Sequence, residues 1–197
     1  NAIEGKSMHL ANVPYGFYTY VVRPNLRLER GFPWIYLGSN TPGHHFPAAK
    51  IDLPDHTLAM PYAMPGLFLL ATAGCLLSAW CAPGARVAIA VTWLAAVPMS
   101  LALFAAVATA QRYTGDFCPL LITAAALGLA GISALRPAAR VFALILASLA
   151  TTAAVAVTWA LTLHYQGETL WGVPEETRAH YRELRQAVDA GVTSKPR

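Results

Sequence analysis

The residues whose types and spacing could do chemistry lie in one short polar stretch, residues 110–119, inside an otherwise apolar part of the chain. Arg112 and Asp116 are its charged members, and because they are four residues apart they would share a face on a helix. A guanidinium there could hold an anionic group such as a lipid phosphate, with further hydrogen bonds from Gln111 and Tyr113. The other interpretation is a structural ion pair of Arg112 and Asp116 that ends two helices at a membrane surface. The residues alone leave both open.

A second group of titratable residues lies earlier in the chain and comprises His44, His45, Asp52, Asp55 and His56. Imidazole and carboxylate ligands suit a divalent metal ion. The spacing matches no known metal site, however, and the prolines and glycine among these residues indicate irregular loop. We therefore favour a solvated loop and predict no metal.

Motifs for nucleotide, zinc-peptidase or serine-hydrolase chemistry are missing from the sequence. The apolar segments contain no paired histidines that would ligate haem, so no cofactor is predicted. The three cysteines, Cys75, Cys81 and Cys118, lie in or beside apolar segments without metal-site spacing and are interpreted as small hydrophobes. The net charge is only +4 with no basic run, which argues against a nucleic-acid partner.

The element that must position these residues is a nearly uncharged run from Leu58 to Leu163. Its charged residues are Arg86, Arg112, Asp116, Arg136 and Arg140. They divide the run into four apolar stretches, each close to the roughly 20 residues that a helix needs to cross a bilayer. The sequence therefore predicts an all-α polytopic membrane protein with four transmembrane helices.

The four predicted spans are Leu58–Ala82, Val87–Ala110, Phe117–Leu135 and Val141–Leu163. Pro61 and Pro65 lie near the start of the first span, and Pro98 lies near the middle of the second. Alanine, glycine and serine dominate the last two spans, and such small residues let membrane helices approach closely.

The orientation follows from the arginines in the short connections. Arg86 lies between the first two spans, and Arg136 and Arg140 lie between the last two, with no acidic residue beside them. We assign this face to the cytoplasm. Both termini and residues 111–116 then face outward, and the predicted location is an inner, cytoplasmic membrane of a bacterium.

The rest of the chain divides into an outward lead and an outward tail. Residues 1–57 form an aromatic, proline-rich lead that is expected to be irregular. Residues 164–197 form a charged tail in which Pro174, two following glutamates and the spacing of Tyr181, Leu184 and Val188 predict a short amphipathic helix, Pro174–Ala190. Trp159, His164 and Trp171 are expected to mark the outer membrane interface.

Residues 111–117, Gln111-Arg112-Tyr113-Thr114-Gly115-Asp116-Phe117, are followed by Pro119-Leu120-Leu121. This stretch resembles a turn that opens a late transmembrane helix in bacterial multi-pass glycosyltransferases of the polyprenyl-phosphate-dependent, GT-C-like type. The lead, with Pro14-Tyr15-Gly16-Phe17-Tyr18 and Arg23-Pro24, is similar to the outward segment before such helices. The resemblance covers residues 12–135.

The resemblance implies the C-terminal part of an enzyme that transfers a sugar from a lipid phosphate at the outer face. Its catalytic carboxylate would lie in an earlier loop, so no residue here takes that role. Arg112 is the one position carried over, as a phosphate contact. The alternative function is a non-catalytic subunit of a larger membrane complex. The expected partners are membrane lipids and either other membrane subunits or a preceding region of the same protein.

Overall fold

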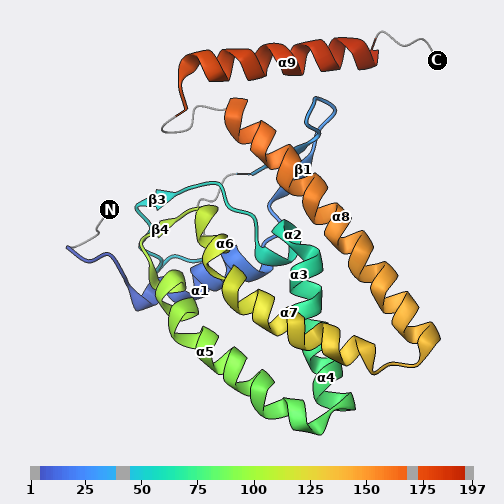
Figure 1. Ribbon diagram of the computed structural model, residues 1–197. Coiled ribbons are helices and arrows are strands. Elements are labelled where there is room, and N and C mark those ends of the chain that lie inside the picture. Colours follow the sequence, from blue (N-terminus) through green and yellow to red (C-terminus); the bar gives the residue numbers. More distant parts are fainter. Residues whose placement is uncertain (1–4, 39–44, 168–172, 194–197) are drawn as a thin grey trace. The chain divides into compact units, whose positions relative to one another are not determined.

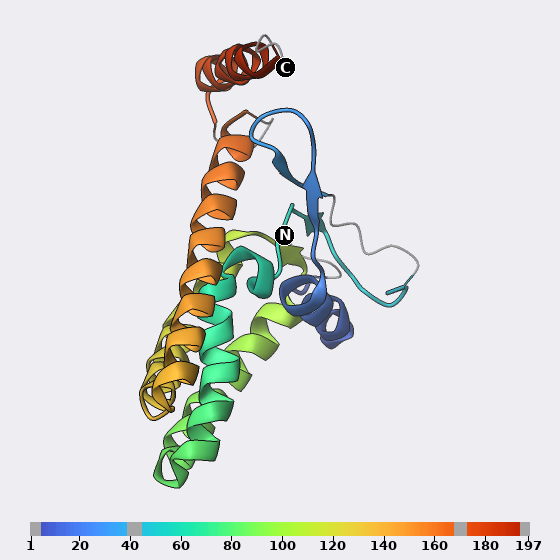
Figure 2. The same cartoon turned by 90° about the vertical axis from the view of Figure 1, so that its right-hand side faces the viewer.

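The computed structural model describes residues 5–38, 45–167 and 173–193. The chain forms two compact units, one of Asn1–Asn25 with Ser39–Ala154 and one of Leu26–Gly38 with Val155–Arg197. The fold is mostly helical, as the sequence predicts, and its elements are shown in Figures 1 and 2. The site candidates of residues 110–119 belong to the first unit.

Four apolar helical segments follow one another along the chain in the predicted order. The first is broken into α2 (Met60–Ala63), α3 (Pro65–Leu69), a π-helical stretch (Leu70–Gly74) and α4 (Cys75–Cys81). The others are α5 (Arg86–Ala105), α7 (Cys118–Ser133) and α8 (Pro137–Gly167). A short helix, α6 (Arg112–Asp116), precedes α7.

Two of these segments, Pro83–Ala105 and Pro137–Gly167, are long and apolar enough to cross a membrane. The apolar helices Pro65–Cys81 and Cys118–Ser133 are shorter than a membrane span, so the structure does not show the four predicted spans. The first predicted span is interrupted at Met64, where φ is −138° and ψ is 60°. Pro65 follows it, and a proline disfavours the α-helical conformation of the residue before it.

The second predicted span ends early, at Ala105 rather than Ala110. Beyond it, β4 (Ala108–Thr109) pairs in parallel with β3 (Leu53–Pro54), with Leu53 opposite Ala108. On the other side, Met8 forms an antiparallel bridge with Ala106. Residues 106–109 are therefore extended because two parts of the lead take up their backbone hydrogen bonds.

The lead is more regular than the sequence suggested, which corrects that expectation. A 3-10 turn (Leu10–Asn12), α1 (Val13–Phe17) and a π-helical turn (Tyr18–Val22) form one continuous helical stretch. Asn12 is fully buried and holds this stretch in place. Its side-chain nitrogen donates to the carbonyls of Lys50 at 2.9 Å and Ala106 at 3.1 Å, and its oxygen accepts from the Lys50 N–H at 2.6 Å.

Close backbone contact joins α7 to the π-helical stretch and α4. A Cβ on Gly128 would overlap the carbonyl oxygen of Leu70, and a Cβ on Gly131 would overlap Ser78. Cys75 Sγ donates to the Ala124 carbonyl at 3.0 Å, and Ser78 Oγ donates to that of Leu127 at 2.6 Å. The small residues of this segment thus allow the close approach that the sequence predicted.

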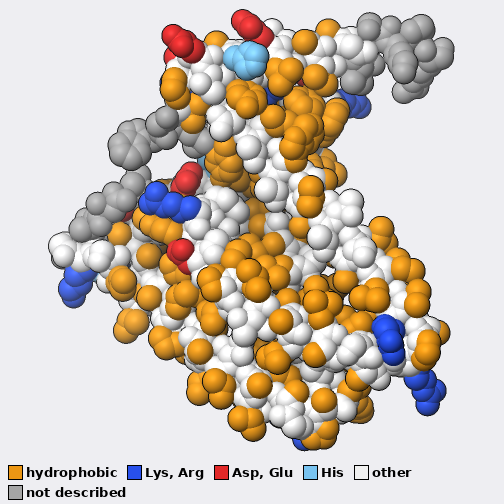
Figure 3. All heavy atoms as spheres, viewed as in Figure 1, with side chains coloured by type: hydrophobic (Ala, Val, Ile, Leu, Met, Phe, Trp, Pro, Cys, Tyr) orange, Lys and Arg blue, Asp and Glu red, His pale blue; other side chains and the backbone are white. Residues whose placement is uncertain are grey.

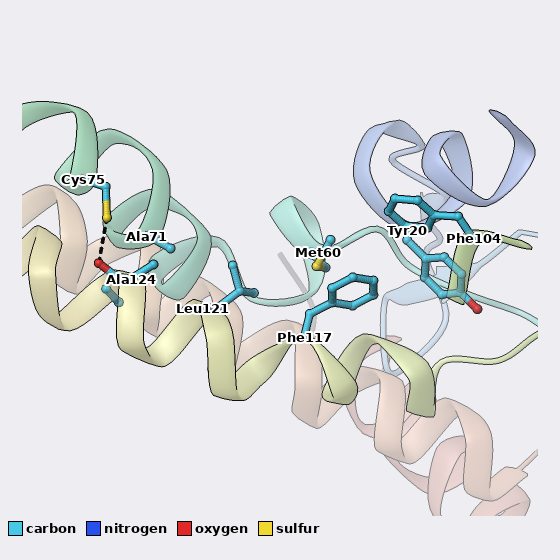
Figure 4. Close-up of a cluster of buried hydrophobic side chains, with 9 residues drawn as sticks. Tyr20, Met60, Ala71, Cys75, Phe104, Phe117, Leu121 and Ala124 are labelled. Carbon is cyan, nitrogen blue, oxygen red and sulfur yellow. Dashed lines mark hydrogen bonds between the residues drawn. The ribbon is translucent and has the colours of Figure 1, made fainter. Parts of the chain in front are cut away.

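The core of the first unit lies where the lead meets α5 and α7 (Figure 4). Tyr20 from the lead stacks against Phe104 of α5, with ring centroids 6.4 Å apart, and contacts Phe117 at 6.2 Å. The cluster continues along α7 through Leu121 and Ala124 to Cys75. An aromatic group from the lead is therefore part of the same core as the apolar helices.

The second unit combines a hairpin, the end of α8 and the tail helix. β1 (Leu26–Leu28) and β2 (Ile35–Leu37) are antiparallel, with Arg27 opposite Tyr36. The peptide before Pro33 is cis, and Trp34 has a positive φ of 66°. The tail helix α9 (Glu175–Thr193) confirms the helix predicted at 174–190, with Arg178 3.1 Å from Glu175.

Candidate functional site

The polar stretch at 110–116 is fixed by the lead on one side and by the start of α2 on the other. The Ala110 N–H donates to the hydroxyl of Tyr20 at 3.1 Å. Gln111 and Thr114 form the next layer, in which Thr114 Oγ1 donates to the Gln111 carbonyl at 2.6 Å. The site is thereby built from residues far apart in the sequence, which spacing alone does not reveal.

Gln111 is a structural residue in this arrangement. Its Oε1 accepts a hydrogen bond from the Leu58 N–H at 2.6 Å, and its Nε2 donates to Thr114 Oγ1 at 3.1 Å. Leu58 is completely buried. Because both ends of the side chain are engaged inside the protein, Gln111 contributes to the position of α6 rather than presenting an amide outward.

Arg112 is exposed, and its guanidinium carbon lies 5.3 Å from the centre of the Tyr113 ring. Tyr113 is half-buried and packs against the core cluster, so it gives the arginine a fixed platform. The Tyr113 side chain is also the main cause that raises the pKa of Arg112 above its usual value, with smaller contributions from Asp55 and Asp116. Arg112 therefore stays a cation at any physiological pH.

Asp116 lies one turn after Arg112 on α6, so the two share a face as predicted. Across the residues that the structure describes, no ion pair joins them, and Asp116 is exposed. The structural pair stays a prediction. The geometry shows an arginine held by an aromatic ring, with carboxylates near enough to act on it electrostatically.

An apolar cavity of about 250 Å³ lies beside this region, between α5, α7, α3 and the lead. Its walls include Trp93, Ala96 and Phe104 from α5, Phe117 between α6 and α7, Leu121 from α7, and Phe17 from the lead. Phe104, Phe117 and Leu121 also belong to the core cluster on which Tyr113 packs. Arg112 and the cavity are thus connected through one set of packed side chains.

The cavity has almost no polar lining, and its two threonines donate their hydroxyls to carbonyls of their own helices, Thr72 to Phe68 and Thr92 to Ala88. Water needs two to four polar partners in a cavity, so this space suits an apolar group. For scale, an apolar cavity of about 150 Å³ in an engineered protein stays dry and accepts benzene.

The sequence did not indicate this cavity. On α5, Trp93, Ala96, Ser100 and Phe104 line it at helical spacing, a pattern that membrane helices also use for packing. The sequence signal that could have indicated the cavity is the combination of large aromatic rings and small residues on this face of α5. Asn12 and Tyr20 were missed too, since their partners are distant in sequence.

In the described part of the lead, the side chains of His45, Asp52, Asp55 and His56 are not grouped as metal ligands would be. Asp55 Oδ1 accepts from the His56 N–H at 2.8 Å, and the backbone N–H groups of Asp52 and Asp55 donate to the carbonyls of Val107 and Thr109. His44 lies outside the described residues. Elsewhere in the described ranges, no three His, Cys, Asp or Glu side chains are grouped as a metal ion would require.

Of the predicted interface markers, His164 and Trp159 belong to the second unit, and Trp171 lies outside the described residues. His164 is buried, and its ring centroid lies 4.9 Å from that of Tyr36. Trp159 is 55% exposed on α8. His164 therefore packs inside its unit, whereas Trp159 presents its ring outward.

Comparison of the chain with protein-family models, with curated protein sequences and with solved structures finds no match.

Proposed function

We propose that this chain is an integral membrane protein that binds one phosphorylated lipid at its outer end. The lipid's apolar chain would lie in the cavity between α5 and α7, and its phosphate would meet Arg112. The observation that carries the proposal is an almost wholly apolar cavity whose walls share packed side chains with the platform of an exposed arginine.

Membrane insertion is supported by where the apolar surface lies. Of the most apolar windows in Pro83–Ala105 and Pro137–Gly167, 0% and 6% of the residues are buried inside the protein. A core helix of a soluble protein would be mostly buried, whereas Leu94 is 72% exposed and Leu149 is 64% exposed. Figure 3 shows hydrophobic side chains spread over α5 and α7 with few charges among them. Lipid tails are the environment that such a surface favours.

The arginine suits a phosphate for reasons of shape and charge. A guanidinium offers a planar set of donors that match phosphate oxygens, whereas an ammonium acts as a point charge. The basic connections at Arg86 and at Arg136 and Arg140 lie at the other end of the first unit from α6 (Figures 1 and 2). By the positive-inside rule, α6 and Arg112 then face outward.

This binding role is consistent with the resemblance to glycosyltransferases that use a lipid-phosphate sugar donor. Within the proposal, Arg112 would hold the donor's phosphate, and Gln111 and Thr114 would fix the helix that carries it. The proposal assigns no catalytic residue to this chain.

The test is the lipid that co-purifies with the protein in mild detergent, measured by native mass spectrometry. Arg112→Gln should lose most of the phosphorylated lipid, and Arg112→Lys should keep part of it, because the ammonium lacks the bidentate fork. Asp116→Asn should bind at least as much lipid as the unchanged protein, since it removes a negative charge near the phosphate. Equal lipid retention in Arg112→Gln and the unchanged protein would refute the proposal.

A second candidate function, a non-catalytic subunit of a larger membrane complex, is favoured by one observation. Trp80 is 85% exposed and Leu76 is 75% exposed on α4, at the end of the first unit away from Arg112. Small-residue and apolar surfaces of this kind also suit contact with a partner helix. A stoichiometric partner protein retained after Arg112→Gln but lost after Trp80→Ala would favour this function over lipid binding.

A further inference from the structure

Three aromatic side chains of the second unit gather at one place, where the tip of the β1–β2 hairpin meets Trp159 of α8. Phe32 lies edge-on to Trp34, with centroids 5.0 Å apart, and edge-on to Trp159 of α8 at 5.8 Å. Phe32 is buried between the two tryptophans, which are 43% and 55% exposed. These three side chains form an aromatic patch in which both tryptophan rings are partly exposed.

We propose that this aromatic patch, Phe32, Trp34 and Trp159, is a membrane anchor that lies at the boundary between lipid headgroups and hydrocarbon. The proposal rests on α8 crossing the membrane, as proposed above. The patch binds the lipid surface itself. The proposal thus adds the hairpin tip to the part of the chain that contacts the membrane.

The depth of the patch follows from its contact with α8. The apolar run of α8 from Val141 to Leu163 is centred near Thr152, and Trp159 lies seven residues beyond it. At about 1.5 Å per residue, Trp159 lies roughly 10 Å from the membrane centre. The hydrocarbon of a bilayer extends about 15 Å from its centre, so Trp159 lies just inside the edge of the hydrocarbon. Tryptophan is enriched at this boundary because its ring is apolar and its N–H remains able to bond.

The hairpin tip is held at this depth by polar contacts within the second unit. The Phe32 N–H donates to Asp189 Oδ1 of α9 at 2.8 Å, and the Tyr36 hydroxyl donates to the Phe32 carbonyl at 2.7 Å. Arg185, one turn earlier on α9, donates to the α8 carbonyls of Leu163 at 2.9 Å and His164 at 2.8 Å. The tail helix therefore fastens both the hairpin and the end of α8 (Figures 1 and 2).

The conformation of Trp34 shows that folding alone does not favour a tryptophan there. Its φ of 66° lies in the left-handed region, where glycine is tolerated and bulky side chains are strained. Its backbone is engaged at both ends, since its N–H donates to the Gly31 carbonyl at 2.8 Å and its carbonyl accepts from Glu29 at 2.9 Å. A membrane interface that takes up the exposed part of this ring would offset part of the strain.

The charges next to the patch fit the headgroup side of that boundary. Arg27 and Arg30 on the hairpin are exposed, and Glu29 lies between them. Long arginine side chains can reach phosphate groups while nearby rings stay in the apolar layer. The hairpin thus combines an apolar tip with basic flanks.

The experiment uses the full chain in vesicles of phosphatidylcholine and phosphatidylglycerol, with Trp34 as the single tryptophan. Trp80, Trp93, Trp159 and Trp171 are replaced by phenylalanine, which keeps the ring contact at 159. Fluorescence is then quenched with lipids brominated near the headgroup or near the end of the acyl chain, and with aqueous iodide. Leu149→Trp and Glu183→Trp in a background without other tryptophans serve as membrane-core and aqueous references.

Trp34 is expected to be quenched more strongly by the shallow-brominated lipid than by the deep one, and less by iodide than the Glu183→Trp reference. Asp189→Ala should weaken lipid quenching of Trp34, whereas Asp189→Asn should keep it, because the amide oxygen still accepts the Phe32 hydrogen bond. If Leu149→Trp is quenched by the deep lipid and Trp34 by neither lipid, the anchor is refuted while membrane crossing stands. If Leu149→Trp is not quenched, the proposed membrane crossing itself fails.

Discussion

The side-chain oxygen of Gln111 accepts a hydrogen bond from the backbone N–H of Leu58, 53 positions earlier in the chain, at 2.6 Å. This bond joins the segment before α2 to the start of α6, because Leu58 leads into α2 and Gln111 leads into α6. The same residue was a candidate lipid contact on sequence grounds. The sequence suggested the same lipid-binding role for Gln111 and Arg112. The hydrogen bond gives Gln111 a structural role instead and leaves Arg112 as the candidate phosphate contact.

Removing this bond should destabilise the protein without removing lipid. Gln111→Ala leaves the N–H of the buried Leu58 without this acceptor, and an unsatisfied buried group costs about 1–3 kcal/mol. Gln111→Glu keeps the acceptor oxygen and should be milder. Thermal unfolding in detergent measures the loss of stability, and the amount of lipid retained per folded protein measures any role of Gln111 in lipid binding. A large loss of lipid at unchanged stability would contradict this assignment.

The contact between α7 and the π-helical stretch is the most sensitive place for added volume. Gly128→Ala should destabilise the protein by about 1–3 kcal/mol, because its Cβ would overlap the Leu70 carbonyl oxygen and the helices must separate. Gly115→Ala on α6 is the matched control, since nothing lies within 4 Å of a Cβ there. Differential scanning calorimetry of the two variants in the same detergent should show a clearly lower melting temperature for Gly128→Ala and little change for Gly115→Ala. Equal melting temperatures would show that the helices do not pack this closely.

Alkaline pH should weaken the first unit through Tyr20. Burial is the main cause that raises the pKa of the Tyr20 hydroxyl above its usual value of about 10, and the bond from Ala110 offsets this only in part. The unfolded chain therefore releases this proton at a lower pH than the folded one. Stability from this group is fully present below about pH 10 and is lost as the pH rises beyond it.

Tyr20→Phe should accordingly reduce the loss of stability between pH 9 and pH 11, although it lowers stability at neutral pH by removing the acceptor of the Ala110 N–H. Some alkaline loss should remain, because burial also raises the pKa of Tyr15. Unfolding temperatures measured across this range provide the test, with Tyr62→Phe on a half-exposed ring as the control. An unchanged pH dependence in Tyr20→Phe would exclude Tyr20 as its source.

The orientation in the membrane gives a further prediction. With Cys75, Cys81 and Cys118 replaced, Gly115→Cys should react with an impermeant maleimide added outside cells, and Ala138→Cys should not. Both positions are exposed, so access decides the outcome. The opposite labelling pattern would place Arg112 on the cytoplasmic face and remove the outward lipid site.

Much of the helical framework was predictable from the sequence. Apolar runs and their charged breaks locate α5, α7 and α8 within a few residues, and Pro174 with the spacing of Tyr181, Leu184 and Val188 locates α9. The breaks near Met64 and Ala106 were harder. The break at Met64 could be anticipated from Pro65. The extended conformation of residues 106–109 depends on backbone pairing with Met8 and Leu53, which no local sequence pattern reveals. The early end of α5 followed from these tertiary contacts.

The candidate site shows the same division. Arg112 was recognisable because charged residues are rare in this part of the chain. The structural role of Gln111 and the cavity were not recognisable, since they arise from Leu58 and from faces of α5 and α7 that come together only in the fold. Asn12 is the clearest case, as its buried amide bonds to residues 38 and 94 positions away.

The central claim, that the cavity between α5 and α7 holds the apolar chain of a phosphorylated lipid, is tested most directly by filling it. Ala96 lines the cavity, whereas Ala95 is exposed and is not among the lining residues. Ala96→Phe and Ala95→Phe therefore add the same volume to the same helix on different faces. Native mass spectrometry of both variants should show the phosphorylated lipid lost from Ala96→Phe and retained by Ala95→Phe. Retention of the lipid by a folded Ala96→Phe protein would contradict the account.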